Sequence, residues 1–185
     1  MVCSFDKAKR YVRHNPLVLI GLMGAGKTSI GKRLASTLDV PFSDADQEIE
    51  KAAGKTINEI FAEHGEAFFR DGERRVIARL LSGGGMVLAT GGGAFMNTDT
   101  RKSVADKGIS VWLKADIDLL MSRVMRRDNR PLLRTSDPRA VMEKLIGERY
   151  PVYAEADIVI DSRDVPHDVI VKEIIEAVAK CHKCA

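Results

Sequence analysis

The chain has 185 residues, of which 45% are hydrophobic, 30% are charged and only 5% are aromatic, and its formal net charge is +3. This length and composition are typical of one globular domain with a single core, and they exclude a largely disordered chain. The few aromatic residues are not interleaved with basic runs, which disfavours binding to nucleic acid.

The first fifteen residues carry Lys7, Lys9, Arg10 and Arg13 but lack the apolar core of a signal peptide. We expect residues 1–15 to form a flexible or loosely packed N-terminal extension. The domain proper is expected to begin at residue 16.

Residues 17–22 predict a short apolar strand, and residues 27–38 predict a helix. The apolar run that begins at Leu17 ends at Lys27, so it is far too short to cross a bilayer. Between strand and helix, Gly21-Leu22-Met23-Gly24-Ala25-Gly26-Lys27-Thr28 fills every fixed position of the phosphate-loop pattern G-x-x-x-x-G-K-[ST].

This loop predicts binding of ATP or GTP. Its glycines let successive N–H groups face one concavity, the Lys27 ammonium reaches the β- and γ-phosphates, and the Thr28 hydroxyl is a ligand for Mg²⁺. A glycine-rich turn without a ligand is the alternative, and the flanking strand and helix disfavour it. The loop alone does not separate a kinase from a switch GTPase or a motor.

Residues 40–43 predict the second strand, and Asp44-Ala45-Asp46 follows it before a helix over 46–53. In an extended segment, side chains two residues apart point the same way, so we expect both carboxylates to face one pocket. One serves Mg²⁺ and the other accepts the proton of a substrate hydroxyl. The alternative is that one aspartate only caps the helix.

Two helices are predicted over 56–63 and 66–82, and the third strand over 86–90. Arg70 lies three residues before Glu73 on the second helix, close enough for an ion pair that fixes the guanidinium. Directly after the strand, Gly91, Gly92 and Gly93 leave the mouth of the site free of side chains, so that the backbone can approach a ligand.

The remaining elements are helices over 99–106, 116–126, 138–149 and 167–181 and strands over 109–114 and 157–161. We expect Pro151 to end the helix that carries Arg149. An arginine-rich, proline-broken segment at about 126–137 predicts a mobile lid over a triphosphate. The chain ends in a Cys181-His182-Lys183-Cys184 sequence, which offers too few ligands for a well-framed metal site.

Five apolar strands separated by helices predict an α/β fold, a three-layer α/β/α sandwich with a five-stranded parallel sheet of the P-loop NTP hydrolase type. Ligands of such sheets bind at the carboxyl ends of the strands. Three cysteines near the termini indicate no disulfide framework and favour a reducing, cytoplasmic compartment.

Six motifs in chain order resemble the signature of the shikimate kinase family over about residues 16–180. They are the phosphate loop, Asp44-x-Asp46, Phe68-Phe69-Arg70-Asp71-Gly72-Glu73, Gly91-Gly92-Gly93-Ala94, Arg130-Pro131-Leu132-Leu133 and Arg149-Tyr150-Pro151-Val152-Tyr153-Ala154.

The resemblance implies a single kinase domain over residues 16–181 that transfers the γ-phosphate of ATP to the 3-hydroxyl of shikimate, with Mg²⁺. It implies Asp46, Lys27 and Arg130 as catalytic residues and Thr28 and Asp44 as metal ligands. Shikimate is expected to contact Asp46, Arg70, Gly91, Gly92, Gly93 and Arg149, with the two arginines clamping its carboxylate. ATP is expected to contact Gly24, Ala25, Gly26, Lys27, Thr28, Ser29, Arg126, Arg127, Arg130 and Arg163, and Arg123 is a further candidate for stacking on adenine.

Another small-metabolite kinase on the same scaffold, such as a gluconate kinase, is the alternative within enzymes. A switch GTPase is disfavoured because the sequence contains no Asn-Lys-x-Asp base-reading motif. We expect a cytoplasmic monomer whose partner is a small molecule, without a membrane or nucleic-acid partner.

Overall fold

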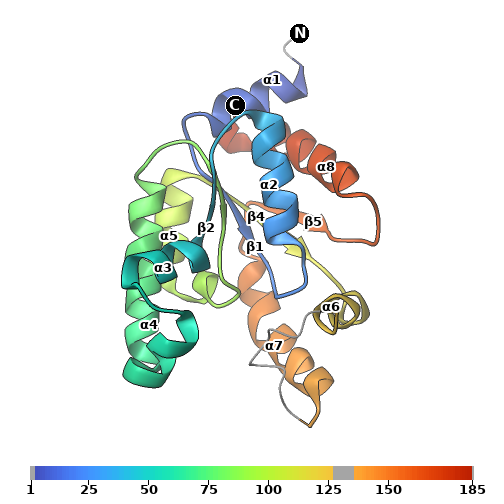
Figure 1. The fold of residues 1–185 in the computed structure, drawn as a ribbon. Coiled ribbons are helices and arrows are strands. Elements are labelled where there is room, and N and C mark those ends of the chain that lie inside the picture. Colours follow the sequence, from blue (N-terminus) through green and yellow to red (C-terminus); the bar gives the residue numbers. More distant parts are fainter. Residues whose placement is uncertain (1–2, 127–135, 185) are drawn as a thin grey trace.

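The structure, a computed structural model, describes residues 3–126 and 136–184. A single sheet of parallel strands forms its centre, in the order β2-β3-β1-β4-β5 (Figure 1). The strands are β1 (Leu17–Ile20), β2 (Phe42–Asp44), β3 (Val87–Ala89), β4 (Ile109–Lys114) and β5 (Ile158–Asp161). The predicted five-stranded parallel sheet is confirmed, with strands up to two residues shorter than expected.

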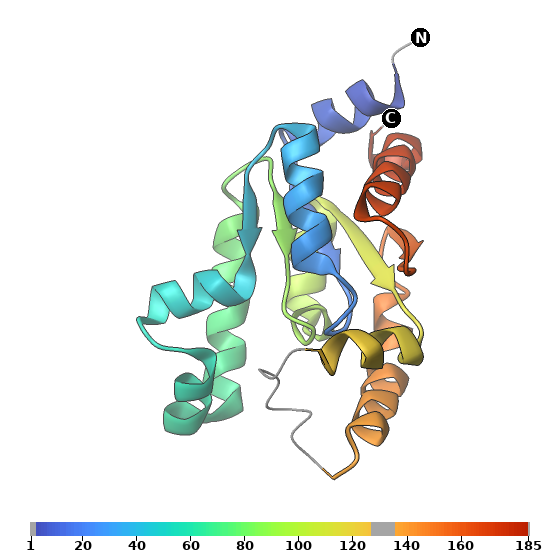
Figure 2. The ribbon, with the colours of Figure 1, turned by 45° about the vertical axis from the view of Figure 1, so that its right-hand side comes forward.

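Helices cover both faces of this sheet, so the three-layer architecture is confirmed. The helices are α1 (Ser4–Val12), α2 (Lys27–Leu38), α3 (Ala45–Ala53), α4 (Ile57–Leu81), α5 (Thr98–Lys107), α6 (Ile117–Val124), α7 (Pro138–Tyr153) and α8 (His167–Lys180). Two short 3₁₀ turns, η1 (Ala94–Met96) and η3 (His182–Cys184), complete the described elements. Helices α1, α2 and α8 pack together, and α4 packs against α5 (Figures 1 and 2).

The position of each strand in the sheet explains its pattern of side chains. Every residue of the central strand β1 is buried, because β3 and β4 flank it and helices cover both of its faces. At the edge, β5 alternates instead: Ile158 and Ile160 are buried, whereas Val159 and Asp161 are exposed. A continuous apolar run therefore marks the middle of this sheet, and alternation marks its edge at β5.

The N-terminal segment differs from the expected flexible extension, because residues 4–12 form helix α1. Phe5, Ala8 and Val12 are spaced three and four residues apart, so they share one face of the helix. Ala8 and Val12 are 0% exposed, and α1 packs on α8. The helix thus contributes to the core at the end of the sheet where both termini lie (Figure 1).

Two helix boundaries also bear on the site. Gly65, with φ 79° and ψ 178°, interrupts α4, which confirms the predicted division into two helices. The expected end of α7 before Pro151 is wrong, since the helix continues to Tyr153 with Pro151 inside it. A proline near a C-terminus removes only one backbone hydrogen bond, which burial of Tyr153 can offset. Arg149 and Tyr153 therefore lie one turn apart on a continuous helix.

None of the helices in the described parts of the chain is long and apolar enough to cross a membrane.

Candidate active site

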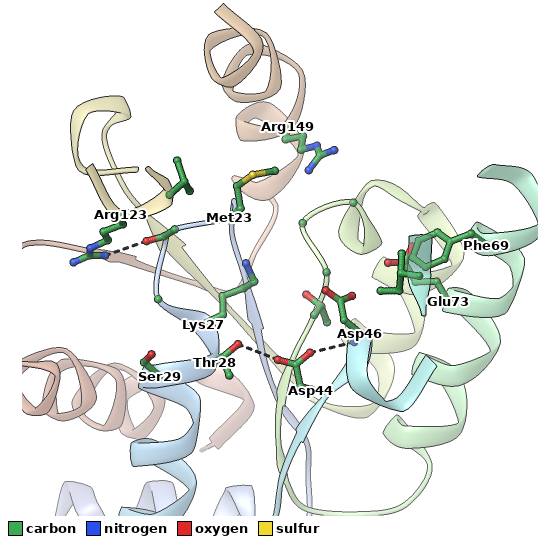
Figure 3. Close-up of a pocket in the computed structure, with 18 of the residues that line it drawn as sticks. Met23, Lys27, Thr28, Ser29, Asp44, Asp46, Phe69, Glu73, Arg123 and Arg149 are labelled. Carbon is green, nitrogen blue, oxygen red and sulfur yellow. Dashed lines mark hydrogen bonds between the residues drawn. The ribbon is translucent and has the colours of Figure 1, made fainter. Parts of the chain in front are cut away.

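A cavity of about 540 Å³ lies where the strands end, at the opposite end of the sheet from the two termini (Figure 3). Most of the predicted site residues in the described part of the chain line it: Gly24, Gly26, Lys27, Thr28, Ser29, Asp44, Asp46, Arg70, Gly91, Gly92, Gly93, Arg126 and Arg149. Ala25 belongs to the same loop but is buried beneath it. The tertiary structure thus brings segments more than one hundred residues apart into one site.

The phosphate loop has the backbone that its glycines were expected to allow. Gly24 and Gly26 have φ of 85° and 98°, values that residues with a Cβ rarely adopt. The Lys27 ammonium donates to the carbonyl oxygens of Gly21 at 2.7 Å and of Leu22 at 3.0 Å, which holds it over the loop. Helix α2 begins here without a side-chain cap, so its N-terminal N–H groups face the cavity as an anion site.

Asp44 links the phosphate loop to the second strand. One of its carboxylate oxygens, Oδ2, accepts a hydrogen bond from the Thr28 hydroxyl at 2.9 Å, and the other, Oδ1, accepts one from the Asp46 N–H at 3.1 Å (Figure 3). The reason given for the two carboxylates sharing a pocket is wrong, because β2 ends at Asp44 and Asp46 lies in the first turn of α3. Asp44 is thus the cap of α3, as the alternative expected, and it also accepts from the Thr28 hydroxyl.

The donor atoms near Thr28 fit Mg²⁺. A hydroxyl oxygen and a carboxylate oxygen are hard ligands, and they lie next to the loop that binds phosphate. Within residues 3–126 and 136–184, no group of three or more His, Cys, Asp or Glu side chains forms a metal site. Mg²⁺ characteristically needs only one or two protein ligands, with water and phosphate oxygens completing its octahedron.

The glycine triplet is required by close approach of side chains, since none of the three has a positive φ. A Cβ atom placed on each would come within 3 Å of a polar side chain: 2.7 Å from Asp46 Oδ1 at Gly91, 2.9 Å from Arg149 Nη1 at Gly92 and 2.5 Å from Arg70 Nη1 at Gly93. Contacts this short do not occur for real Cβ atoms. The triplet is therefore the floor on which one carboxylate and two guanidinium groups rest.

Arg70 is fixed by two carboxylates of α4, as expected for Glu73. Its Nη1 atom lies 2.8 Å from Glu73 Oε2, and its Nε atom lies 3.3 Å from Glu66 Oε1. Burial raises the pKa of Glu73, even though the Arg70 guanidinium favours its charged form. Glu73 and Glu66 hold the pKa of Arg70 above its ordinary value despite burial of the guanidinium. The guanidinium is thus charged and oriented toward the cavity floor.

The arginines expected near ATP are placed differently from one another. Arg126 lines the cavity, whereas the Arg163 side chain pairs with Glu173 and is not among the lining residues. Arg123 also lines the cavity, and its guanidinium donates to the carbonyl oxygens of Gly24 at 3.2 Å and of Arg163 at 2.9 Å. Arg127, Arg130 and most of the expected lid lie outside the described residues.

Sequence reasoning missed the apolar wall of the cavity. Ile57, Phe61 and Phe69 of α4 line it, and the rings of Phe61 and Phe69 lie 4.7 Å apart. Met23, Thr90, Val124 and His167 complete the lining residues that had not been expected. The spacing of four residues between Ile57 and Phe61 is that of any helix packed on a core, so no signal in the sequence distinguished these two residues. Phe69 stands in one of the six motifs, but no role was assigned to it.

Comparison with known proteins gives one family for this chain. A family model described as shikimate kinase matches residues 23–179. A shikimate kinase of Bradyrhizobium diazoefficiens is 60% identical over 168 residues, which cover 91% of this chain and 81% of that protein.

Solved structures give the same result. The structure of a shikimate kinase from Acinetobacter baumannii in complex with shikimate superposes with a TM-score of 0.87 at 36% identity, covering 92% of this chain and 96% of that one. A gluconokinase from Sinorhizobium meliloti has a TM-score of 0.61 at 17% identity, covering 91% of this chain and 93% of that one. At that identity the likeness shows the fold alone.

Proposed function

The chain belongs to the shikimate kinase family, and on this premise we propose how its residues divide the work of the reaction. The enzyme transfers the γ-phosphate of ATP to the 3-hydroxyl of shikimate, giving shikimate 3-phosphate and ADP, with Mg²⁺. The observation that carries the assignment of residues is that one cavity joins an anion-binding loop to two guanidinium groups, with Asp46 in the same cavity (Figure 3).

Arg70 and Arg149 hold the carboxylate of shikimate. A guanidinium binds a carboxylate through two parallel hydrogen bonds, which fixes the orientation of the ring as well as its position. The two arginines come from α4 and α7, and both guanidinium groups reach the glycine triplet, Arg70 at Gly93 and Arg149 at Gly92. The aromatic wall of Phe61 and Phe69 packs against the apolar part of the ring. Shikimate is therefore held with its hydroxyls toward the phosphate loop.

Asp46 receives the proton of the 3-hydroxyl. Its carboxylate lines the cavity near Lys27, and its Oδ1 atom lies over Gly91 (Figure 3). A carboxylate within hydrogen-bond reach of the attacking hydroxyl orients it and accepts its proton as the oxygen bonds to phosphorus. The Asp46 N–H is tied to Asp44, so the position of this base is coupled to that of the metal ligands.

The loop from Gly24 to Ser29 holds the phosphates of ATP. Lys27 stabilises negative charge on the β- and γ-phosphates, and the N-terminal N–H groups of α2 add to it. Thr28 and Asp44 would hold Mg²⁺, which when bound would neutralise charge on the phosphate oxygens. Arg126 and Arg123 lie on the side of the cavity formed by α6 and its C-terminal end. ATP and shikimate thus meet between Lys27 and Asp46.

We also propose that the enzyme works as a cytoplasmic monomer without a nucleic-acid partner. Its kinase domain covers residues 16–181, and α1 packs on this domain. Two features support this. The cavity is built by one chain, and Cys3, Cys181 and Cys184 are all free thiols, as a reducing compartment favours.

The test is a coupled assay of ADP release in the presence and absence of shikimate. We expect release to be fast only with shikimate, because its correctly placed hydroxyl attacks the γ-phosphate readily, whereas water in the same site is a poor nucleophile. The matched control is an analogue with a ketone in place of the 3-hydroxyl, which keeps the carboxylate and should bind without releasing ADP. Equal rates with shikimate and with the ketone would contradict transfer to the 3-hydroxyl.

A further inference from the structure

Tyr153, the last residue of α7, is completely buried beneath the cavity floor. Its ring meets Phe95 and Trp112 edge to face, with ring centroids 6.5 Å and 5.9 Å away, and lies 6.2 Å from the ring of Tyr150. Packing on several sides leaves the ring one position. The hydroxyl at its tip is therefore a fixed point in the structure.

This hydroxyl reaches the site at the glycine triplet. It donates to the carbonyl oxygen of Gly92, the middle glycine of the triplet. The guanidinium of Arg149, four residues earlier and hence on the same face of α7, lies against the same glycine: a Cβ atom on Gly92 would lie 2.9 Å from Arg149 Nη1 and 3.8 Å from the Tyr153 hydroxyl oxygen. Burial raises the pKa of Tyr153 to about 12, so near neutral pH the hydroxyl keeps the proton that it donates to Gly92.

The two arginines of the site are held in different ways. Arg70 is oriented by the carboxylates of Glu73 and Glu66. In the described part of the chain no carboxylate forms a close ion pair with Arg149, although Glu73 acts on its charge from farther away. The side chain that meets its guanidinium at Gly92 is the neutral phenol of Tyr153. A neutral partner fixes the direction of a guanidinium without offsetting its charge, which leaves that charge for an incoming carboxylate.

We propose that Tyr153 is a positioning residue for shikimate, one whose hydroxyl fixes the Arg149 guanidinium against the Gly92 backbone before the substrate binds. The inference rests on the proposed role of Arg149 in holding the substrate carboxylate. It predicts that removing the hydroxyl weakens shikimate binding through Arg149 and leaves the ATP side of the cavity unchanged.

The test compares Tyr153→Phe with Tyr150→Phe. Both variants keep an aromatic ring of the same cluster and lose one phenol hydroxyl, but the Tyr150 hydroxyl donates to the carbonyl oxygen of Ala115, outside the cavity lining. We expect Tyr153→Phe to raise the KM for shikimate roughly tenfold, the order expected for a lost hydrogen bond to a charged group, with the KM for ATP unchanged. Tyr150→Phe should change either KM by less than about twofold.

A double-mutant cycle with Arg149→Lys separates positioning from a general loss of packing. If Tyr153 acts through Arg149, its effect on the KM for shikimate should largely disappear in the Arg149→Lys background. All variants are assayed below the unfolding midpoint of the least stable one, so that a loss of stability does not enter the comparison.

Two results would overturn the proposal on its own: an effect of Tyr153→Phe no larger than that of Tyr150→Phe, or an effect of equal size in both backgrounds. A different result would overturn the carboxylate clamp itself and this inference with it, namely an Arg149→Lys variant whose KM for shikimate equals that of the wild type. The failures are therefore distinguishable.

Discussion

The Nη1 atom of Arg70 lies 2.8 Å from Oε2 of Glu73, whose side chain is only 5% exposed. A buried carboxylate of this kind orients a guanidinium far better than an exposed one, because water does not compete for it. The second carboxylate beside Arg70 belongs to Glu66, whose side chain is 69% exposed and whose Oε1 atom lies 3.3 Å from Arg70 Nε. The two glutamates therefore offer a matched pair of substitutions.

We expect Glu73→Gln to raise the KM for shikimate by roughly tenfold, since a neutral amide replaces the charged acceptor, weakens its hydrogen bond with Arg70 and lets the guanidinium turn away from the cavity floor. Glu66→Gln should change it by less than about twofold, as is usual for an exposed pair. Steady-state kinetics with each substrate varied in turn measures both. Equal effects of the two substitutions would show that burial of Glu73 does not matter for the clamp.

The raised pKa of Glu73 gives a dependence of stability on pH. Because burial raises the pKa in the folded state, the folded chain binds this proton more tightly than the unfolded chain does. The contribution of Glu73 to the free energy of unfolding is therefore most favourable below the pKa of the unfolded chain, and it falls as pH rises to the folded-state pKa.

Urea unfolding of the wild type and of Glu73→Gln over a series of pH values checks this sign. The difference in free energy, wild type minus variant, should decrease as pH rises through that window and then stay constant. An increase with pH would mean that the ion pair with Arg70, rather than burial, dominates the titration of Glu73.

The contact between the glycine triplet and the guanidinium groups predicts the effect of a single methyl group. In Gly93→Ala the new Cβ would lie 2.5 Å from Arg70 Nη1, so the guanidinium must move. We expect the KM for shikimate to rise by roughly tenfold or more, because a displaced guanidinium no longer meets the carboxylate in its bidentate geometry. The KM for ATP should stay close to that of the wild type.

Gly72→Ala is the matched control, since a Cβ at this position of α4 has no neighbour within 4 Å. It should leave both KM values unchanged and raise the free energy of unfolding by about 0.5–1 kcal/mol, the usual gain from replacing a helical glycine by alanine. Unchanged shikimate binding in Gly93→Ala would argue against Arg70 as a ligand of the carboxylate.

Asp46→Asn keeps the shape of the side chain but removes the acceptor for the proton of the 3-hydroxyl. We expect kcat to fall by about 10²–10⁴, the usual contribution of a general base. ADP affinity, measured by isothermal titration calorimetry, should be nearly unchanged. If nucleotide affinity were lost as well, the role of Asp46 would instead be to bind the metal or to support Asp44, whose carboxylate accepts a hydrogen bond from the Asp46 N–H.

Lys27→Met removes the ammonium group from the phosphate loop while the backbone of the loop remains. We expect kcat to fall by roughly 10² or more, in line with the loss of one preorganised contact to the transition state. Lys32→Met, on the exposed side of the same helix, is the control and should keep wild-type turnover. Wild-type turnover in Lys27→Met would exclude this loop as the place of phosphoryl transfer.

Much of the site could be predicted from contiguous residues. The phosphate loop needs glycines at fixed positions because its backbone adopts positive φ, and this local requirement is visible in the sequence. Asp44 is the last residue of β2, and the glycine triplet follows β3 after one residue, so the parallel sheet was enough to place them at one edge. The sheet itself was predictable because strands covered on both faces must be apolar throughout.

The tertiary structure decided what depends on the packing of distant segments. Helix α1 was taken for a flexible extension, and the segments that its apolar face packs against, mainly α8 with α2 and η3, come later in the chain. The reason for the glycine triplet, its contact with Asp46, Arg149 and Arg70, involves three other elements and leaves no local trace.

The same distinction separates Glu73 from Glu66 and Tyr153 from Tyr150. Each pair is alike in residue type and in helix. The sequence by itself placed only Glu66 and Glu73 on their helix, because the helix that carries Arg149 was expected to end before Pro151. Burial, the shift of a pKa and the partner of a hydroxyl arise from the segments that cover a residue. For that physical reason the sequence was sufficient to predict the fold class, the phosphate loop and the reaction. The groups that hold the arginines in place were found only in the folded structure.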